Sequence, residues 1–210
     1  RYLSKEEKVR LYSALTARNQ SKRLARRSHE TWASKRNTKL YSLLSRVYMD
    51  NLMPLVLLAI NTGMRRGELF DLNWADIDLD SKVITVRGEI SKSGYTRHIP
   101  LTDEAYRCVI NWKNDQGSAG LVFSSPVTGR RLDNINSSWE KLMKLAKLEN
   151  FRFHDLRHHF ASTLVMRGVD LNTVRELLGH RDLKTTLCYA HLAPEHKAAA
   201  ISLLNSDAAS

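Results

Sequence analysis

The chain has 210 residues, 42% of them hydrophobic and 26% charged, which is typical of a globular protein with a sizeable buried core. Its longest apolar run, residues 52–60, is about half of the ~18 residues needed to cross a bilayer, and it contains Pro54. There are two cysteines, neither in a CxxC pair, and no secretory signal. We therefore expect a cytoplasmic protein, and disfavour secretion, membrane spanning and a zinc ribbon.

The charge of the chain is strongly positive and unevenly distributed. Lysine and arginine number 33 against 22 acidic residues, a formal net charge of +11, and the isoelectric point is near 9.8. Residues 1–50 alone carry 13 basic and 4 acidic side chains. Such a segment attracts a polyanion through counterion release, so the charge indicates a nucleic-acid partner. The alternative is a basic segment that is merely solvated.

The first quarter of the chain predicts a helix followed by a basic insertion. Ser4 and Glu7 form a capping box before a run of apolar positions that includes Leu11 and Leu15. Residues 18–46 are basic and polar, and we expect a surface loop or a partly helical insertion there. Within it, we expect four residues to contact DNA phosphates: Lys22, Arg23, Arg26 and Arg27.

The remaining elements predict an α+β fold that is mostly α, a helical domain with one small three-stranded antiparallel sheet. An apolar helix at 48–61 ends before Gly63, and a short helix follows at 66–72. Strands are expected at 76–79, 82–87 and 96–101, and a loop at 116–131. Later helices are expected at 102–115, 133–147, 154–167, 171–178 and 182–190, with a tail helix at 194–205 and with Gly168 and Gly179 at helix ends. We expect residues 1–210 to form a single domain.

Four polar clusters carry the chemistry. They are residues 62–69 (TGMRRGEL), residues 91–94 (SKSG) at a hairpin tip, residues 154–159 (HDLRHH), and residues 178–181 (LGHR), the last followed by Tyr189. Cleaving a phosphodiester without a metal requires cations that neutralise the non-bridging oxygens in the transition state. Arginine suits this because its planar guanidinium donates two parallel hydrogen bonds and stays charged. His154 and Arg157 are three residues apart and share one helix face.

In order and spacing these motifs resemble those of the tyrosine recombinase, or phage integrase, family over about residues 1–205. The resemblance implies a catalytic domain that cleaves DNA with neither metal nor cofactor. It also implies a role for each residue: Tyr189 forms a 3′-phosphotyrosyl bond, Arg65 and Arg157 clamp the phosphate, Lys92 protonates the leaving 5′-oxygen, His154 is the general base, and His180 hydrogen-bonds the phosphate. Glu68 would support Arg65, His158 would pack behind the site, and Arg66 would face DNA or solvent.

Several alternatives remain open on the sequence alone. His154, His158 and His159 could be read as zinc ligands, but no HExxH pattern or third ligand of convincing spacing accompanies them. Some roles have rival candidates: Tyr95 and Tyr106 for the role of Tyr189, Lys82 and Arg97 for that of Lys92, and Arg66 for that of Arg65. Two acidic residues also have ordinary structural explanations. Glu68 could be a surface-helix partner of Arg65, and Asp155 could be a helix N-terminal acid.

The resemblance predicts a site-specific recombinase, foremost an integrase of a prophage or another mobile element. A chromosome-dimer resolvase and a non-catalytic DNA-binding regulator of the same fold are the alternatives. Expected partners are double-stranded DNA attachment sites, other protomers in a DNA-bound tetramer, and accessory DNA-bending or directionality proteins. The basic insertion departs from a compact catalytic domain, and we expect the family's N-terminal core-binding domain to lie outside this chain.

Overall fold

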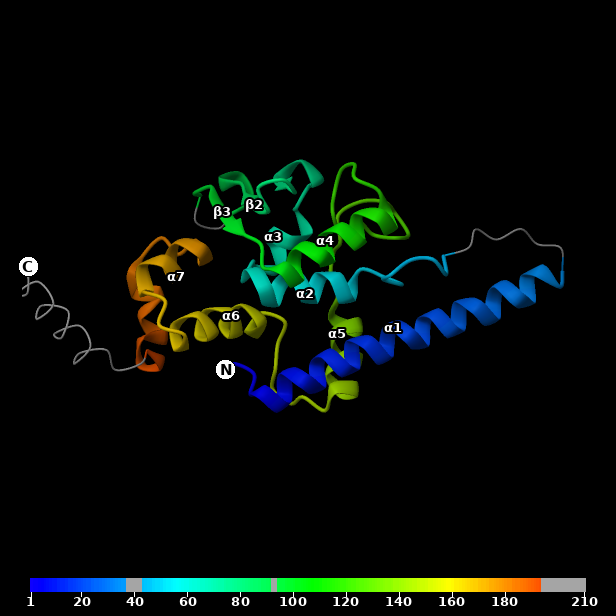
Figure 1. Cartoon of the computed structure of the whole chain (residues 1–210), viewed down its shortest axis with the longest axis horizontal. Helices are drawn as coiled ribbons and strands as arrows, with labels where there is room; N and C mark the ends of the chain where they lie inside the picture. The colour runs from blue at the N-terminus through cyan, green and yellow to red at the C-terminus, as the bar shows by residue number, and fades with distance from the viewer. Residues whose placement is uncertain (37–42, 92–93, 194–210) are drawn as a thin grey trace, which may run out of the picture.

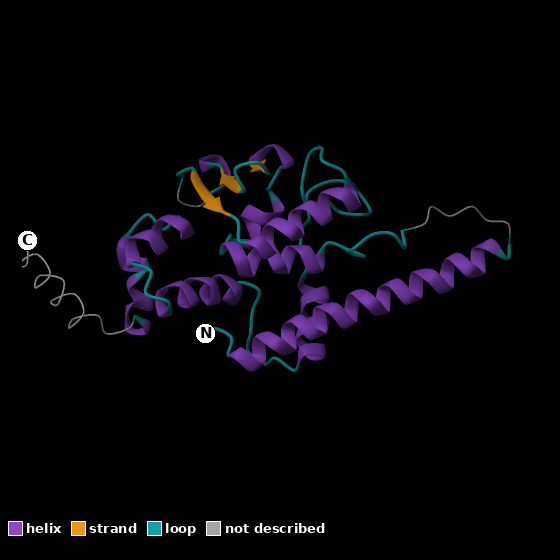
Figure 2. Ribbon diagram, viewed as in Figure 1, coloured by secondary structure: helices purple, strands orange, loops and turns teal. Residues whose placement is uncertain are grey.

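The computed structural model describes residues 1–36, 43–91 and 94–193, and shows helices surrounding one small sheet (Figures 1 and 2). The α-helices are α1 (Lys5–Ser34), α2 (Leu52–Thr62), α3 (Arg66–Phe70), α4 (Asp103–Gln116), α5 (Asn136–Ala146), α6 (Asp155–Met166) and α7 (Leu171–Leu178). The strands are β1 (Ile77–Asp78), β2 (Val83–Val86) and β3 (Arg97–Pro100). The predicted fold class is confirmed. Within the described residues, no helix is long and apolar enough to cross a bilayer.

Helix α1 begins at the predicted capping box and continues far beyond the predicted end. Ser4 and Glu7 satisfy each other's backbone amides, and the helix then runs unbroken to Ser34. Of the two alternatives expected for residues 18–46, the loop is therefore wrong for residues 18–34, which are helical and continuous with the capped helix. No glycine or proline interrupts this stretch, and Arg26 pairs with Glu30 one turn later at 3.0 Å. Figure 1 shows the distal half of α1 projecting away from the rest of the protein.

The chain that follows α1 is tied back to it by basic side chains. Arg23 donates hydrogen bonds to the carbonyls of Leu44 and Arg46, each at 2.5 Å. Arg18 pairs with Asp50 at 2.6 Å, and Lys22 pairs with the same carboxylate at 2.9 Å. The basic residues of this stretch therefore have structural roles of their own.

The apolar helix predicted over residues 48–61 begins four residues later, at Leu52, and ends with Thr62. The backbone amides of Val47 and Tyr48 donate instead to the carboxylate of Asp115 at the end of α4, which holds this segment outside the helix. Along α2 nearly every residue is buried, as expected for a helix that is apolar on all sides.

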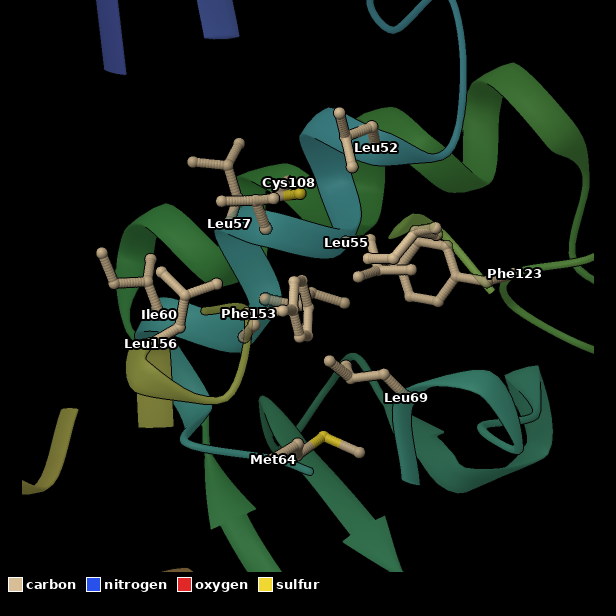
Figure 3. Packing of buried hydrophobic residues seen from close by; sticks show 14 of the residues in the cluster. Leu52, Leu55, Leu57, Ile60, Met64, Leu69, Cys108, Phe123, Phe153 and Leu156 are labelled. Carbon is tan, nitrogen blue, oxygen red and sulfur yellow. The ribbon is translucent and has the colours of Figure 1, made fainter. Parts of the chain in front are cut away.

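Helix α2 forms the centre of the main core and packs against both α4 and α6. Figure 3 shows the side chains of α2 meeting those of other elements: Leu69 of α3, Cys108 of α4, Phe153 just before α6, and Leu156 of α6. A second, smaller cluster joins α6 and α7 to the chain that follows, through Ala161, Val165, Val174, Leu178 and Tyr189. Helix α6 thus connects the main core to the C-terminal part of the described chain.

The sheet is an antiparallel meander with β2 at its centre. Ile84 of β2 lies opposite Ile77 of β1 and Ile99 of β3, and both Ile84 and Ile99 are buried against the core. The strands are shorter than predicted at their ends. A 3-10 turn, Gly88–Ile90, ends the pairing after β2 and leads toward the hairpin tip.

The helix predicted over residues 182–190 is not formed. Two 3-10 turns, Leu183–Thr185 and Leu187–Leu192, occupy this region instead. The junction between them is the fully buried Thr186, whose hydroxyl is 2.9 Å from Nδ1 of His180. Consecutive β-branched threonines disfavour an α-helix, and this side-chain contact fixes the chain in a tighter path. The predicted tail helix at 194–205 lies outside the described residues.

Candidate active site

The turn between α2 and α3 requires a glycine and places the first arginine. Gly63 has φ +64°, in the left-handed region. A Cβ atom there would lie 2.5 Å from Cδ1 of Phe160, so a larger residue would clash with α6. Two residues later Arg65 caps the N-terminus of α3, with its side chain partly exposed. The turn between the two helices therefore places the guanidinium of Arg65 at the edge of the core.

Glu68 is buried beneath Arg65 and holds it. Its carboxylate accepts hydrogen bonds from the backbone amide and from Nη1 of Arg65, both at 2.8 Å. The buried Arg97 of β3 forms a bidentate pair with the same carboxylate, at 3.0 and 2.7 Å. Burial opposes ionisation, but the hydrogen bonds and charge of Arg97, together with the hydrogen bonds from Arg65, outweigh it and lower the pKa of Glu68. Glu68 is thus a buried support and not an ordinary surface partner.

Arg157 of α6 joins two helix ends. Its Nη1 donates to the carbonyl of Gly63 and its Nη2 to that of Leu178, each at 2.7 Å. Arg65 reaches the adjacent carbonyl, that of Gly179, at 3.4 Å, so both arginines meet the end of α7. Burial, reinforced by the charge of Arg65, lowers the pKa of Arg157 to about 9.

Tyr189 lies in the second 3-10 turn and points toward α6. Its hydroxyl is 2.6 Å from Nδ1 of His158, and the tyrosine is 5% exposed. Burial raises the pKa of Tyr189 to about 12, against the lowering effect of Arg157. His158 lies edge-on to His154, with ring centroids 5.1 Å apart. The structure therefore brings the phenol, two imidazoles and Arg157 to one place.

His180 follows the left-handed Gly179 at the end of α7, as predicted from the sequence. Its Nδ1 contacts the hydroxyl of Thr186, which leaves Nε2 as the other polar atom of the ring. Burial, with the charges of Arg157 and Arg65, lowers the pKa of His180 to about 4. At neutral pH the ring is therefore an uncharged imidazole beside the two arginines.

Other candidate residues lie elsewhere or face other partners. His159 points away from this site, since its Nδ1 accepts a hydrogen bond from the amide of Leu3 at 3.3 Å, so the three histidines do not converge. Asp155 accepts from the amide of Arg152 in the first turn of α6, as a helix N-terminal acid does. Arg66 is exposed and donates to Asn136 at 3.2 Å. Lys92 lies outside the described residues.

Among the proposed phosphate contacts in residues 18–46, three have partners within the protein. Lys22 pairs with Asp50, Arg23 donates to main-chain carbonyls, and Arg26 pairs with Glu30. Arg27 lies on an exposed position of α1.

Sequence reasoning missed Arg97 as a member of the site, because it treated this residue as a rival of the hairpin lysine. The signal was present in its position: a charged residue at an inward-facing place of a strand with alternating burial. Besides its pair with Glu68, Arg97 donates from Nε to the carbonyl of Leu177 at 2.9 Å. It thereby connects the sheet, α3 and α7.

The arrangement is suited to binding an oxyanion. Arg65 and Arg157 come from positions 92 residues apart in the numbered sequence and meet at consecutive carbonyls of α7. Within the described residues, no cluster of three or more His, Cys, Asp or Glu side chains has the arrangement of a metal site. A phosphate at this point would meet guanidinium and imidazole donors, with a tyrosine hydroxyl beside them.

The chain is similar in sequence to a known protein family and to individual members of it. Residues 11–196 match the model described as the phage integrase family. The integrase of Salmonella phage P22 is 34% identical over 157 residues, which cover 70% of this chain and 41% of that protein. The tyrosine recombinase XerA of Pyrococcus furiosus is 30% identical over 155 residues, covering 72% and 54%. The chain spans about half the length of these curated relatives.

Two solved structures superpose on the chain. The catalytic domain of bacteriophage HP1 integrase is 26% identical and superposes with a TM-score of 0.57, over 72% of this chain and 80% of that one. A crystal structure of XerA recombinase, 23% identical, has a TM-score of 0.65 over 98% of this chain and 63% of that one, and shows a shared fold.

Proposed function

The chain belongs to the phage integrase family, and on that premise we propose that it is the catalytic domain of a site-specific tyrosine recombinase. The observation that carries the proposal is the convergence of Tyr189 with Arg65, Arg157 and His180, which come from four separate segments. A non-catalytic DNA-binding regulator of the same fold would have no need to keep a buried phenol near Arg157, with Arg65 at the same end of α7.

The proposed reaction uses these groups in one displacement. The oxygen of Tyr189 attacks phosphorus and forms a phosphotyrosyl bond with the 3′ end of the broken strand, while the bond to the 5′-oxygen breaks. Arg65 and Arg157 stabilise the charge on the non-bridging oxygens, and His180 donates a further hydrogen bond. Lys92 protonates the leaving 5′-oxygen, an assignment that rests on the sequence. The covalent bond preserves the energy for rejoining, so no ATP and no metal enter the scheme.

Within this class we propose integration and excision of a mobile element, with double-stranded attachment sites as the substrate. The similarity to the phage P22 integrase supports this role. Chromosome-dimer resolution is the alternative, and other relatives are tyrosine recombinases named XerC and XerA. We further propose that the chain forms one catalytic domain, works in a tetramer on paired sites in the cytoplasm, and acts with accessory DNA-bending or directionality proteins.

The test is capture of a covalent complex. The protein is incubated with a pool of labelled, nicked duplexes whose central window is randomised, in the presence of EDTA, and run on a denaturing gel. A shifted protein–DNA band is expected, and sequencing the captured DNA identifies the cleaved site. If no adduct forms with any member of the pool, although the pool is bound, the chain is a binding protein and the proposed function is wrong.

The control is Tyr189→Phe, which removes the nucleophilic oxygen and keeps the packing of the ring. We expect this variant to lose the covalent band entirely while its affinity for the captured duplex, measured by mobility shift, stays nearly unchanged. A persistent adduct in the phenylalanine variant would move the nucleophile to another tyrosine, first to Tyr95 or Tyr106. If chelation stops cleavage and magnesium restores it, the metal-free scheme fails.

A further inference from the structure

We propose that His158, and not His154, accepts the proton of Tyr189 when the phenol attacks phosphorus. This inference rests on the proposed function and assigns one step of it. The sequence indicated that His158 packs behind the site, and the family resemblance implied the base role for His154, but the structure places His158 in direct contact with the hydroxyl of Tyr189. The distance between Nδ1 of His158 and the hydroxyl of Tyr189 is 2.6 Å.

The geometry of α6 explains why this histidine meets the phenol. His154 and His158 are one helical turn apart, and α6 packs against the 3-10 turn that contains Tyr189. His158 is half-buried at this contact, whereas His154 is exposed at the start of the helix. His154 touches the ring of His158, with centroids 5.1 Å apart, so it lies next to the proposed base.

The local electrostatics fit an acceptor at this position. Burial raises the pKa of Tyr189 to about 12, so the phenol keeps its proton near neutral pH and needs a base to act as a nucleophile. Burial and the neighbouring His154 lower the pKa of His158, which keeps its imidazole neutral. A neutral ring protonated on Nε2 presents a free lone pair on Nδ1 to the hydroxyl of Tyr189.

The step is balanced in protons and bonds. The proton of Tyr189 moves to Nδ1 of His158 as the phenolic oxygen bonds to phosphorus, and the P–O bond to the 5′-oxygen breaks. The leaving oxygen takes its proton from the general acid, which the proposed function assigns to Lys92. During rejoining the 5′-hydroxyl gives its proton back to that general acid, now in its basic form, and its oxygen bonds to phosphorus. The P–O bond to Tyr189 breaks, and the imidazolium of His158 returns its proton to the departing phenolate.

The experiment measures the rate of adduct formation on the nicked duplex recovered from the randomised pool. We compare His158→Phe and His158→Asn with His154→Phe, each made with ordinary tyrosine and with a fluorinated tyrosine at position 189. Fluorine lowers the pKa of the phenol and so reduces its need for a base. Because general-base catalysis contributes roughly a hundredfold or more, both His158 variants are expected to form adduct at least about a hundredfold more slowly.

The fluorinated residue should restore much of the rate in both His158 variants and little in His154→Phe. His98→Asn, at an exposed position of β3, is the matched control and should retain the parental rate. His158→Asn keeps the test valid if His158→Phe does not fold. A mobility-shift assay on the same duplex measures whether each variant still binds DNA. If the His158 variants cleave within about threefold of the parent, or if fluorination selectively rescues His154→Phe, the assignment is wrong while the proposed function stands. If the parent itself forms no adduct, both are wrong.

Discussion

At the scale of single residues, the site depends on one buried carboxylate. Glu68 is 1% exposed and has guanidinium partners on two sides, one on α3 and one on β3. A charge in such a position is tolerated because every oxygen is hydrogen-bonded, and it becomes costly as soon as a partner is lost. Glu68 therefore couples the stability of the fold to the position of Arg65.

Replacing Arg97 with alanine tests this coupling. The change removes both hydrogen bonds of the bidentate pair and leaves Glu68 buried with Arg65 as its remaining guanidinium partner. We expect unfolding by urea to report a loss of about 3–5 kcal/mol, as is typical when a buried pair is broken. The matched control is Arg131→Ala, which breaks the exposed pair with Asp71 and should cost at most about 1 kcal/mol. Equal losses in the two variants would contradict a special role for Glu68.

At the scale of elements, α1 is the least expected feature. A 30-residue helix with little apolar surface in its distal half has few contacts to stabilise it, apart from the chain that returns along it. Its N-terminal half packs on α5, while Arg18, Lys22 and Arg23 bind the returning segment. The basic side chains of α1 therefore fall into two groups: some form ion pairs and hydrogen bonds within the protein, and others are exposed to solvent.

Substitutions of one arginine from each group, Arg27 and Arg23, should therefore have different effects. Arg27 is exposed, so Arg27→Ala should weaken binding to a random duplex without changing stability. The slope of log K against log salt should fall by roughly 0.9 for the lost phosphate contact. Arg23→Ala should mainly loosen the segment at residues 43–50, seen as faster amide exchange, because its guanidinium is bonded to main-chain carbonyls. An unchanged salt slope in Arg27→Ala would mean that this face of α1 is merely solvated.

At the scale of the whole molecule, burial of histidines links the fold to pH. Burial lowers the pKa of His159 and of His180 to about 4 each, well below the ordinary value near 6.5. The unfolded chain thus binds a proton on each side chain near pH 6.5, and the folded chain does so only near pH 4. Between these values the unfolded state carries more protons, so acid favours unfolding.

The free energy of unfolding is therefore expected to be highest above about pH 6.5 and to fall as the pH is lowered toward 4. Urea unfolding at a series of pH values measures the slope. The slope of unfolding free energy against pH reports the number of protons taken up on unfolding. His159→Gln should reduce that number by up to one, because glutamine can still accept the hydrogen bond from Leu3 but does not titrate. His98→Gln, at an exposed position of β3, should leave the slope unchanged. A slope that His159→Gln does not alter would show that this histidine is not held neutral by the fold.

The sequence by itself determined the fold class, the capping box at Ser4, the turn at Gly63 and most helices, because local periodicity and helix-end residues report local structure. It also selected Arg65, Arg157, His180 and Tyr189, whose spacing forms recognisable motifs. Only the tertiary structure decided what each side chain touches. Arg97 joins Glu68 across 29 residues and His158 meets Tyr189 across 31, contacts that no local pattern encodes. The same holds for α1, where long-range bonds to Asp50 and to the returning backbone support a helix in a stretch for which the polar sequence left loop and partial helix open.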